Sequence, residues 1–520
     1  MNLLRAAGSI SFFTLVSRIF GLWRDRLMAQ TLGAGWVQGT FLLAWTFPNL
    51  MRRLLGEGAL SASLVPAYAA ARKRGGTEAR ELLGQVAGTV TTILTPLCLL
   101  IAIASLLLPA EWLPAPEKGG VPAMRLLLSL NAILFLYALP VCLTAVFSGA
   151  MNTLGKFALP AAVPIVLNLF WILALLTAKP LGFTIDTEIA NYAAFCLTIG
   201  GFLQLLLVTV PLWRRGELAR PRFGLPLRGT PAFAVFAAMG PMVIGMSLNQ
   251  ISSLLDQLMA YYLVAPGAVT YIYLANRLLL FPHALTAMSV AVAVFPKLAD
   301  QATEIDRQGL RRTLDLAAGA TILVTLPAAL GLIVLGDDVV RVLFQGGEFH
   351  ESDVWPTVLT SSCLVAGLPF IGLAQLYARA FYAVGDAATP ARLAAQLVVL
   401  NAALNLALLL TTDLGTGGLA LSSSISSLAN ASILAVKFHR HAPPGHDLRG
   451  AWLRTLLATA GMCMVLPFLR LFPQDASLLK RGLGNVALPI LVGVGVYVLV
   501  HGLLRSPELQ ALRRRRRAKS

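Results

Sequence analysis

The sequence predicts an all-α polytopic membrane protein in which two parallel six-helix repeats are followed by two C-terminal helices. Hydrophobic residues make up 57% of the 520 residues and charged residues only 12%, whereas a soluble domain is about 45–50% apolar and about 25% charged. Apolar runs of about 20 residues recur along the chain, and each is long enough to cross a hydrocarbon core of ~30 Å. Short sequence words also recur at a nearly constant separation. We therefore expect the bilayer to be the main solvent of this chain.

The apolar runs predict about fourteen transmembrane helices, at roughly 20 residues per span. Arg18 lies within the first run, charged residues follow it directly, and no small-residue cleavage site comes after it. We therefore interpret this run as a membrane helix and not as a signal peptide. The expected spans are centred near Val16, Ala44, Leu97, Phe135, Leu167, Phe202, Met246, Leu285, Leu323, Leu368, Val399, Ser424, Cys463 and Gly493.

The loops between the runs alternate in charge, which predicts their sides of the membrane. Basic loops stay on the cytoplasmic side, so an even number of spans places both termini in the cytoplasm. The basic or mixed loops are 72–74, 214–228, 297–312 and 437–454. The neutral or acidic loops are 32–36, 111–118, 264–269 and 337–353. Loop 470–481 is a weak exception, because it is basic where the alternation requires a neutral or acidic loop.

The net charge of +17 raises the possibility of a nucleic-acid partner. The basic residues are, however, distributed over short loops, which is the positive-inside pattern and argues against nucleic acid. The basic tail 507–520 contains an arginine run at 513–517. We expect this tail to be a cytoplasmic anchor near anionic lipid, and a specific partner site is the alternative.

The sequence predicts neither a metal site nor a catalytic site. Five cysteines lie in separate apolar runs with no metal-ligand spacing, and the histidines are scattered. No Walker A motif or other nucleotide signature is present, so ATP is not the expected driving force. No arrangement of His, Asp and Ser suggests a nucleophile. We expect a transporter with no cofactor, and not an enzyme.

Three words recur in the two halves of the chain and predict an internal duplication. Residues 27–32 resemble 258–263, residues 65–69 resemble 295–299, and residues 155–160 resemble 385–390, at offsets of 230 or 231 residues. An even number of spans in each half makes the repeats parallel, and such transporters bind substrate between their halves near the membrane midplane. The predicted boundaries are 1–215 for the N-terminal half, 229–440 for the C-terminal half, 450–506 for the additional helices and 507–520 for the tail.

Polar residues in the first span form one stripe at helical spacing. Ser11, Thr14, Arg18, Gly21 and Asp25 follow each other at steps of three or four residues, which places them on one helix face. Two further polar residues flank the stripe, namely Ser17 and Arg24. An ionisable residue in a span costs about 2.5–3.5 kcal/mol on insertion scales and by default faces a cavity.

Three other spans carry polar residues, and in the second and the eighth these fall on one side of the helix. The second span has Asn49, Arg52, Arg53, Gly56 and Glu57; the seventh has Asn249, Gln250, Ser253, Asp256 and Gln257; and the eighth has Thr270, Tyr273, Asn276 and Arg277.

These charges have a structural and a functional interpretation. Arg53 lies near a span end, where snorkelling to the interface explains it equally well, and we expect Asp25 and Glu57 to pair with nearby arginines. Four other arginines have too few nearby carboxylates to neutralise all of them, and arginine does not lose its proton. We predict that Arg18, Arg24, Arg52 and Arg277 line a wet, positive cavity. Because guanidinium groups form bidentate bonds with phosphate, this cavity suits a diphosphate.

The sequence resembles the MurJ (MviN) family of lipid II flippases, within the multidrug/oligosaccharidyl-lipid/polysaccharide exporter superfamily, and the resemblance covers nearly the whole chain. Its most specific block is Phe-Pro-Asn-Leu-Met-Arg-Arg-Leu at 47–54, followed by Gly-Glu-Gly-Ala-Leu-Ser at 56–61. The other matching words are Ser-Arg-Ile-Phe-Gly at 17–21, Arg-Asp at 24–25, Val-Pro at 65–66, Asn-Thr at 152–153, Ala-Asn-Arg-Leu at 275–278, Phe-Pro at 281–282, Phe-Gln-Gly-Gly-Glu-Phe at 344–349 and Thr-Pro at 389–390.

The resemblance implies fourteen helices, alternating access and translocation of lipid II, the undecaprenyl-diphosphate-linked peptidoglycan precursor, across the bacterial cytoplasmic membrane. It also implies that the four arginines are essential, and that residues 450–506 contribute a groove for the lipid tail. Many members have an acidic residue early in the second span, where this chain has Gly39. Some members have a sodium site near the seventh and eleventh spans; Asp256 is the acidic candidate, but the nearby Arg379 argues against a simple transfer. We expect membrane lipid as a partner and a monomeric protein.

Three alternative functions stay open: two are transporters, and the third is an enzyme and so belongs to a different class. A flippase for another undecaprenyl-diphosphate oligosaccharide would hold the same diphosphate and differ only in its sugar selectivity. A cation-coupled drug exporter of the same superfamily would need cavity carboxylates and aromatic residues where the first span offers arginines. A membrane-bound glycosyltransferase would need a large outer domain, and the loops here are short.

Overall fold

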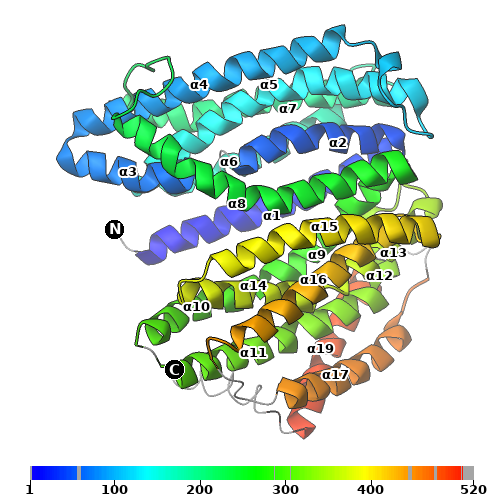
Figure 1. Ribbon diagram of the computed structural model, residues 1–520. Coiled ribbons are helices and arrows are strands. Elements are labelled where there is room, and N and C mark those ends of the chain that lie inside the picture. Colours follow the sequence, from blue (N-terminus) through cyan, green and yellow to red (C-terminus); the bar gives the residue numbers. More distant parts are fainter. Residues whose placement is uncertain are drawn as a thin grey trace. The chain divides into compact units, whose positions relative to one another are not determined.

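The computed structural model describes residues 3–54, 60–285, 287–304, 306–442, 448–473, 477–504 and 506. Throughout these ranges the chain forms helices and no β-strand (Figure 1), so the all-α prediction is confirmed. Ten helices are long and apolar enough to cross a membrane, and shorter apolar helices cover 231–240 and 268–280. The count of about fourteen spans stays a prediction. Gly56, Glu57 and the tail 507–520 lie outside the described residues.

The chain divides into two compact units. The first comprises Met1–Thr270 together with Gly347–Phe349, and the second comprises Tyr271–Gly346 and His350–Ser520. This division follows compactness and does not test the predicted boundaries of the repeats, which stay a prediction.

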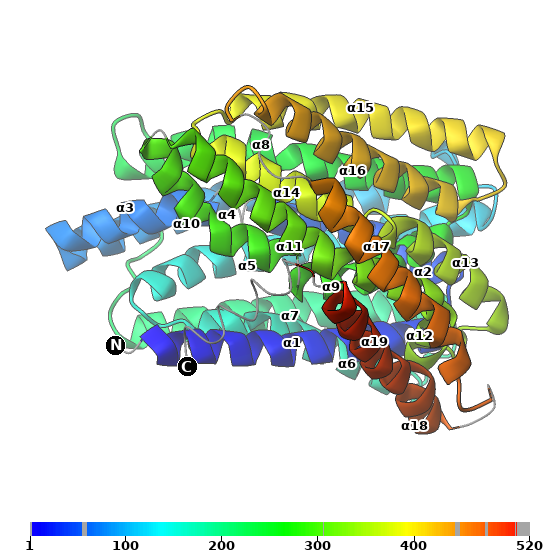
Figure 2. The same ribbon diagram turned by 90° about the horizontal axis from the view of Figure 1, so that it is seen from below.

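The first unit is built around the long helix α5. The apolar face of α5 packs against α2, α4 and α7, while α1 packs along α6 (Figures 1 and 2). A column of buried aromatic rings joins α2, α5 and α6. The helices of this unit are α1 (Leu3–Leu32), α2 (Trp36–Met51), α3 (Leu60–Arg74), α4 (Gly76–Leu107), η2 (Ala110–Trp112), α5 (Gly120–Thr153), α6 (Ala158–Ala178), α7 (Asp186–Arg214), α8 (Pro231–Met259) and η3 (Ala260–Val264).

The second unit has its core between α10, α11, α14 and α16, and Trp452 of α17 packs against it. Helix α9 (Ala268–Leu285) begins in the first unit and continues in the second. The other helices are α10 (Ala287–Thr303), α11 (Arg307–Val334), α12 (Gly336–Phe344), α13 (Glu351–Val365), α14 (Leu368–Ala383), α15 (Ala388–Thr411), α16 (Thr416–Phe438), α17 (Leu448–Val465), η4 (Leu466–Leu469), α18 (Leu478–Arg481), η5 (Gly482–Ala487) and α19 (Leu488–Leu503).

The repeated words adopt the same local structure in both copies. Gly155 ends α5 with φ 71° and Gly385 ends α14 with φ 80°, and glycine favours this left-handed conformation because it has no Cβ. The next amide in each turn donates to the carbonyl five residues earlier, from Lys156 to Met151 and from Asp386 to Phe381, at 2.9 Å in both. Both copies of this word therefore form the same helix-ending turn, and the duplication itself stays a prediction.

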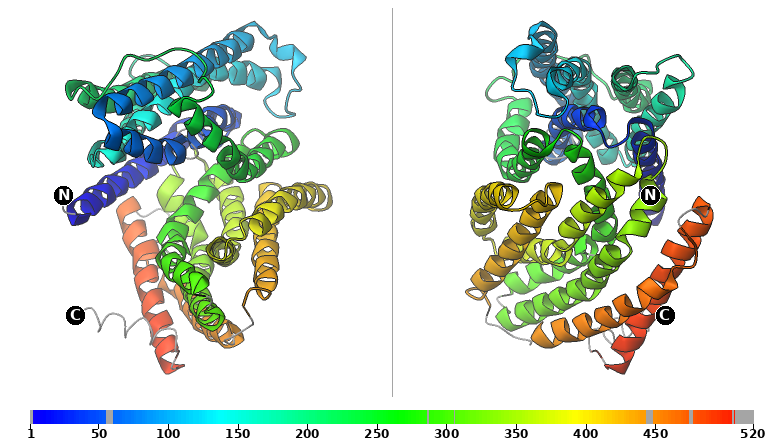
Figure 3. Two further views of the ribbon diagram at one scale, coloured as in Figure 1. Left: turned by 60° about the vertical axis from the view of Figure 1, so that its left-hand side comes forward. Right: turned by 90° about the vertical axis from the view of Figure 1, so that its right-hand side faces the viewer.

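The last two long helices, α17 and α19, pack against each other as a hairpin (Figure 3). Asn485 is 3% exposed and fixes the turn between them. Its side-chain oxygen accepts from the amides of Leu471 and Phe472 at 3.1 and 3.0 Å, and its nitrogen donates to the Phe472 carbonyl at 2.8 Å. Tyr497 on α19 donates to the Leu323 carbonyl of α11 at 2.6 Å, which ties the hairpin to the core of the second unit.

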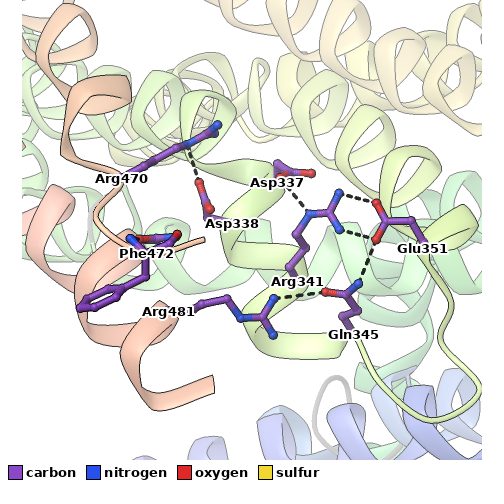
Figure 4. Close-up of polar contacts among 9 residues, drawn as sticks. Asp337, Asp338, Arg341, Gln345, Glu351, Arg470, Phe472 and Arg481 are labelled. Atoms are coloured by element: carbon purple, nitrogen blue, oxygen red, sulfur yellow. Dashed lines mark hydrogen bonds and ion pairs between the residues drawn. The ribbon is translucent and has the colours of Figure 1, made fainter. Parts of the chain in front are cut away.

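Two basic residues of the segment 470–481, Arg470 and Arg481, lie beside helix α12 (Figure 4). Arg470 forms an ion pair with Asp338 at 2.8 Å, and Arg481 donates to Gln345 at 3.4 Å. Burial raises the pKa of Asp338, and the Arg470 charge opposes that rise. The basic character of this segment thus has a structural explanation at one residue, because Arg470 carries the counter-charge of Asp338 on α12.

Arg341, on the same helix, pairs within its own unit. It donates to Asp337 at 2.9 Å and bonds both carboxylate oxygens of Glu351 (Figure 4). Gln345 also donates to Glu351, at 2.9 Å, so α12 and the start of α13 form one polar network.

Candidate anion-binding arginines

The polar stripe of α1 divides into a packed part and an exposed part. Arg24 and Asp25 are buried against α6, at 6% and 2% exposure. Gly21 lies on the same side, because a Cβ there would be 3.7 Å from the Asn168 amide nitrogen. Ser11, Thr14 and Arg18 are exposed, and Arg18 has no hydrogen bond or ion pair within the described ranges. A single helix face in the sequence therefore has two environments.

Arg24 is the centre of a buried network. Its Nε and Nη2 donate to Asp25 Oδ1 at 3.0 and 2.6 Å, and its Nη1 donates to Asn168 Oδ1 at 3.0 Å. Asn168 is 6% exposed and donates its own amide to the Ser17 carbonyl at 3.1 Å. The pairing predicted for Asp25 is present, and the side chain of α6 that completes the network lies 144 residues from Arg24.

An indole ring supports this guanidinium from one side. The Arg24 Cζ lies 4.5 Å from the centroid of the Trp171 ring, which is within the range of a cation–π contact. Trp171 is fully buried and packs against Phe41 and Trp45 of α2. The guanidinium is therefore held by a carboxylate, an amide and an aromatic face, which leaves little positional freedom.

The second span places its arginines where α2 ends. After Met51 the chain continues in a π-helical turn at 52–54, a feature frequently found at functional sites. The half-buried Arg52 donates from Nε and Nη2 to Asn49 Oδ1 at 3.1 and 3.0 Å. Arg53 is exposed and donates to Gln250 of α8 at 3.3 Å. Asn49 thus orients Arg52, while Arg53 has a different partner.

The seventh span, α8, faces α2 through neutral side chains. Gln257 accepts a hydrogen bond of 2.6 Å from Thr46 and donates to the Ser253 carbonyl at 3.3 Å. Asp256 is half-buried on the same helix. Nothing is described for the Asn249 side chain.

Arg277 belongs to the second unit. It donates to the hydroxyl of Tyr273 at 2.7 Å, and its Cζ lies 4.7 Å from the centroid of that ring. Arg277 is half-buried, while Asn276 is exposed and donates to the Ile272 carbonyl at 2.9 Å. Arg277 and Arg24 thus share one feature, because each guanidinium lies over an aromatic ring.

The structure therefore brings together Ser17, Arg24 and Asp25, and separately Asn49 with Arg52. The shared cavity of all four arginines stays a prediction. Asn168 and Trp171 were not predicted, although an asparagine in the apolar run of α6 is a signal that could have identified one of them. Within the described ranges, no three His, Cys, Asp or Glu side chains gather in a way that could hold a metal ion.

Comparison with known proteins decides the family. A family model described as Lipid II flippase MurJ matches residues 28–478. The chain belongs to the MurJ family of lipid II flippases. The resemblance predicted from the sequence is thereby confirmed, and with ten apolar helices a MurJ family member is a multi-pass inner-membrane protein.

MurJ relatives match over most of the chain. A probable lipid II flippase MurJ of Vibrio cholerae is 30% identical over 505 residues, covering 95% of this chain and 94% of the relative. The lipid II flippase MurJ of Burkholderia cenocepacia is 30% identical over 477 residues, covering 90% and 89%.

Solved structures show the same fold. A structure titled Lipid II flippase MurJ, inward closed conformation, has a TM-score of 0.77 at 22% identity and covers 95% of this chain and 98% of its own. An inward-facing multidrug resistance MATE family transporter of the MOP superfamily has a TM-score of 0.63 at 15% identity, covering 88% and 98%. At these identities the likeness concerns the fold alone.

Proposed function

We propose that this protein translocates lipid II from the inner to the outer leaflet of the cytoplasmic membrane. The observation that carries the proposal is membership of the MurJ family over residues 28–478, together with two curated MurJ relatives that match at 30% identity. The protein moves its substrate by alternating access and performs no covalent step. It acts as a monomer with both termini in the cytoplasm, as the basic loops favour.

The arginines bind the diphosphate of the substrate. Arg18, which is exposed, and Arg52 and Arg277, which are half-buried, offer guanidinium donors to an anion. Arg24 is different, because its charge is already balanced by Asp25 at 2.6 Å. It contributes oriented N–H groups rather than net charge. Asn49 holds Arg52 and Tyr273 holds Arg277 in a fixed direction, which reduces the ordering cost of binding.

The test is flipping of fluorescent lipid II by the purified protein in liposomes. Arg18→Ala, Arg52→Ala and Arg277→Ala each remove a charge-assisted contact, so we expect flipping to fall about tenfold or more for each. The matched control is Arg74→Ala, because Arg74 is an exposed arginine at the end of α3 whose ion pair is with Glu78 in the first turn of α4. It should flip at the wild-type rate.

Arg24 requires a different variant. Removing it alone leaves Asp25 buried and uncompensated, which costs about 3–5 kcal/mol and threatens folding. Arg24→Gln combined with Asp25→Asn removes both charges and keeps polar side chains in place. We expect this double variant to insert normally and to lose flipping.

Wild-type flipping by all of these arginine variants would refute the binding role. If the wild-type protein flips another undecaprenyl-diphosphate oligosaccharide but does not flip lipid II, that oligosaccharide is the substrate and the first alternative function holds. Rescue of a bacterium depleted of its lipid II flippase tests the function in cells, and failure to rescue despite correct insertion would contradict it.

A further inference from the structure

The connector between α7 and α8 lies along α3 and α4 of the first unit (Figure 1). Its residues 216–224, which we call the strap, contact both helices. Arg72 of α3 donates to both carboxylate oxygens of Glu217 at 3.0 Å. Arg80 of α4 donates to the Gly216 carbonyl at 3.1 Å. The beginning of the strap is therefore bound to two helices that precede it by more than 130 residues.

The middle of the strap meets α4 backbone to backbone. The Arg222 amide donates to the Gly84 carbonyl at 3.1 Å. A Cβ on Gly84 would lie 2.9 Å from the Arg220 carbonyl oxygen, and a Cβ on Gly88 would lie 2.1 Å from the Arg222 carbonyl oxygen. Both glycines are buried, and they lie one turn apart on the same face of α4. No side chain larger than hydrogen fits at Gly88 unless the strap moves away.

Two threonines of α4 bind the end of the strap. Thr89 donates to the Gly224 carbonyl at 3.1 Å, and the Gly224 amide donates to the Thr92 hydroxyl at 2.9 Å. Gly224 has φ 135°, a conformation that residues with a Cβ rarely adopt. Because both backbone groups of Gly224 bond to side chains of α4, the strap has a defined register on this helix.

Three large apolar side chains of the connector contribute little burial to this docking. Phe223, Leu225 and Leu227 are 71%, 70% and 74% exposed. The ion pair of Arg222 with Glu81 is also exposed on both sides, and pairs of this kind contribute little. The docking therefore depends on hydrogen bonds and on the close approach that the two glycines allow.

Helix α8 begins shortly after the strap and packs against α3. The hydroxyl of Thr230 caps α8, accepting from the Phe233 amide at 3.3 Å. The same hydroxyl donates to the Leu227 carbonyl at 2.7 Å, which closes the turn before the helix. Only residues 225–229 separate the strap from this cap. A docked strap therefore restricts where α8 can begin.

The second unit covers the corresponding helix in another way. At the predicted offset of 230 residues, α4 corresponds to α11 and the strap corresponds to the start of α17. Helix α17 packs along α11, and its Trp452 packs against the core of that unit. A helix thus has the place in the second unit that an extended segment has in the first.

We propose that the strap fastens the start of α8 to α3 and α4, so that these three segments move as one body, and that the close fit at Gly88 keeps it fastened. Helix α8 also carries Gln250, which accepts from Arg53 of the second span. The strap thereby positions the helix that contacts this arginine. The inference goes beyond the proposed function and does not depend on which substrate is moved.

The experiment measures hydrogen exchange of the purified protein in nanodiscs without substrate. Gly88→Ala places a methyl group against the Arg222 carbonyl, and overpacking of this kind shifts an equilibrium by about 5- to 150-fold. We expect exchange to accelerate by that factor in peptides covering 216–228, and by a smaller factor in 230–240 at the start of α8. Peptides from α5 should keep their wild-type protection.

Gly76→Ala is the matched control. Gly76 is the first residue of α4 and has no atom within 4 Å of an added Cβ. The substitution makes the same chemical change on the same helix, and exchange of the strap should equal that of the wild type. Thr89→Val supplies an independent variant, because it removes the hydroxyl that donates to Gly224 and keeps nearly the same shape. It should accelerate exchange of the strap by less than Gly88→Ala does.

Three results would overturn the proposal. Wild-type exchange of the strap in Gly88→Ala would show that the fit at Gly88 does not keep it docked. A strap that exchanges rapidly beside a start of α8 with wild-type protection would show that it does not fasten that helix. Protection lost equally in α5 would indicate general destabilisation. Because the assay contains no substrate, a released strap in a protein that moves no lipid II would retain this inference and reject the proposed function.

Discussion

Replacement of Asn168 by alanine tests whether the network around Arg24 stabilises the first unit. The substitution removes the 3.0 Å bond from Arg24 and the 3.1 Å bond to the Ser17 carbonyl. A hydrogen bond to a charged group contributes about 1.5–3 kcal/mol, and an interhelical bond in a membrane averages about 0.6 kcal/mol. We expect the free energy of unfolding to fall by roughly 2–4 kcal/mol. Asp25 still compensates Arg24, so the loss should stay below that of Asp25→Ala, about 3–5 kcal/mol.

The assay is reversible unfolding of the purified protein in mixed detergent micelles. Asn131→Ala on α5 is the matched control, because the side-chain oxygen of Asn131 has no hydrogen-bond partner among the described residues. Removing this half-buried amide, whose oxygen has no partner, should change stability by less than about 1 kcal/mol. Equal losses in Asn168→Ala and Asn131→Ala would refute the network as a source of stability.

A charged variant separates stability from transport. Asn168→Asp keeps an oxygen that accepts from Arg24 but cannot donate to the Ser17 carbonyl, and it adds a carboxylate beside the Arg24–Asp25 pair. If Arg24 lies on the path of a diphosphate, the added negative charge repels that anion. We expect Asn168→Asp to be more stable than Asn168→Ala and yet slower in flipping lipid II. Faster flipping by Asn168→Asp than by Asn168→Ala would contradict this.

Three further predictions concern the second unit. Asn485→Ala removes three bonds from the turn before α18 and should lower the free energy of unfolding by about 1–3 kcal/mol; a loss no larger than that of Asn131→Ala would contradict it. Asp386 accepts hydrogen bonds from the hydroxyl and the amide of Thr389, and these bonds lower the pKa of Asp386. The contribution of Asp386 to stability is therefore complete above about pH 4 and is lost as the pH falls through the lower folded-state pKa. Asp386→Asn should flatten this acid dependence in a pH series of unfolding curves. Tyr497→Phe removes the bond to the Leu323 carbonyl and should cost about 0.6–1.7 kcal/mol in the same unfolding assay, and an unchanged stability would show that this bond does not anchor the hairpin.

The sequence by itself determined the helical fold. In a bilayer every backbone N–H and C=O must be satisfied within the segment, so an apolar run of sufficient length forms a helix whatever its neighbours are. The sequence also identified the repeated words at Gly155 and Gly385, and the structure shows that both glycines have positive φ. The pairing of Asp25 with an arginine also followed from the sequence, because the partner is the adjacent residue.

Only the tertiary structure decided the partner of each polar group across helices. Arg24 meets Asn168 over a separation of 144 residues, and Arg53 meets Gln250 over 197. Helical periodicity gives the face on which a side chain lies, but the neighbouring helix and its register depend on packing of the whole unit. Gly39 is the clearest case. In the sequence, Gly39 stands where many family members have an acidic residue; in the fold, the Pro266 carbonyl lies where a Cβ of residue 39 would be. A one-dimensional pattern records side chains, whereas that contact is between two backbones.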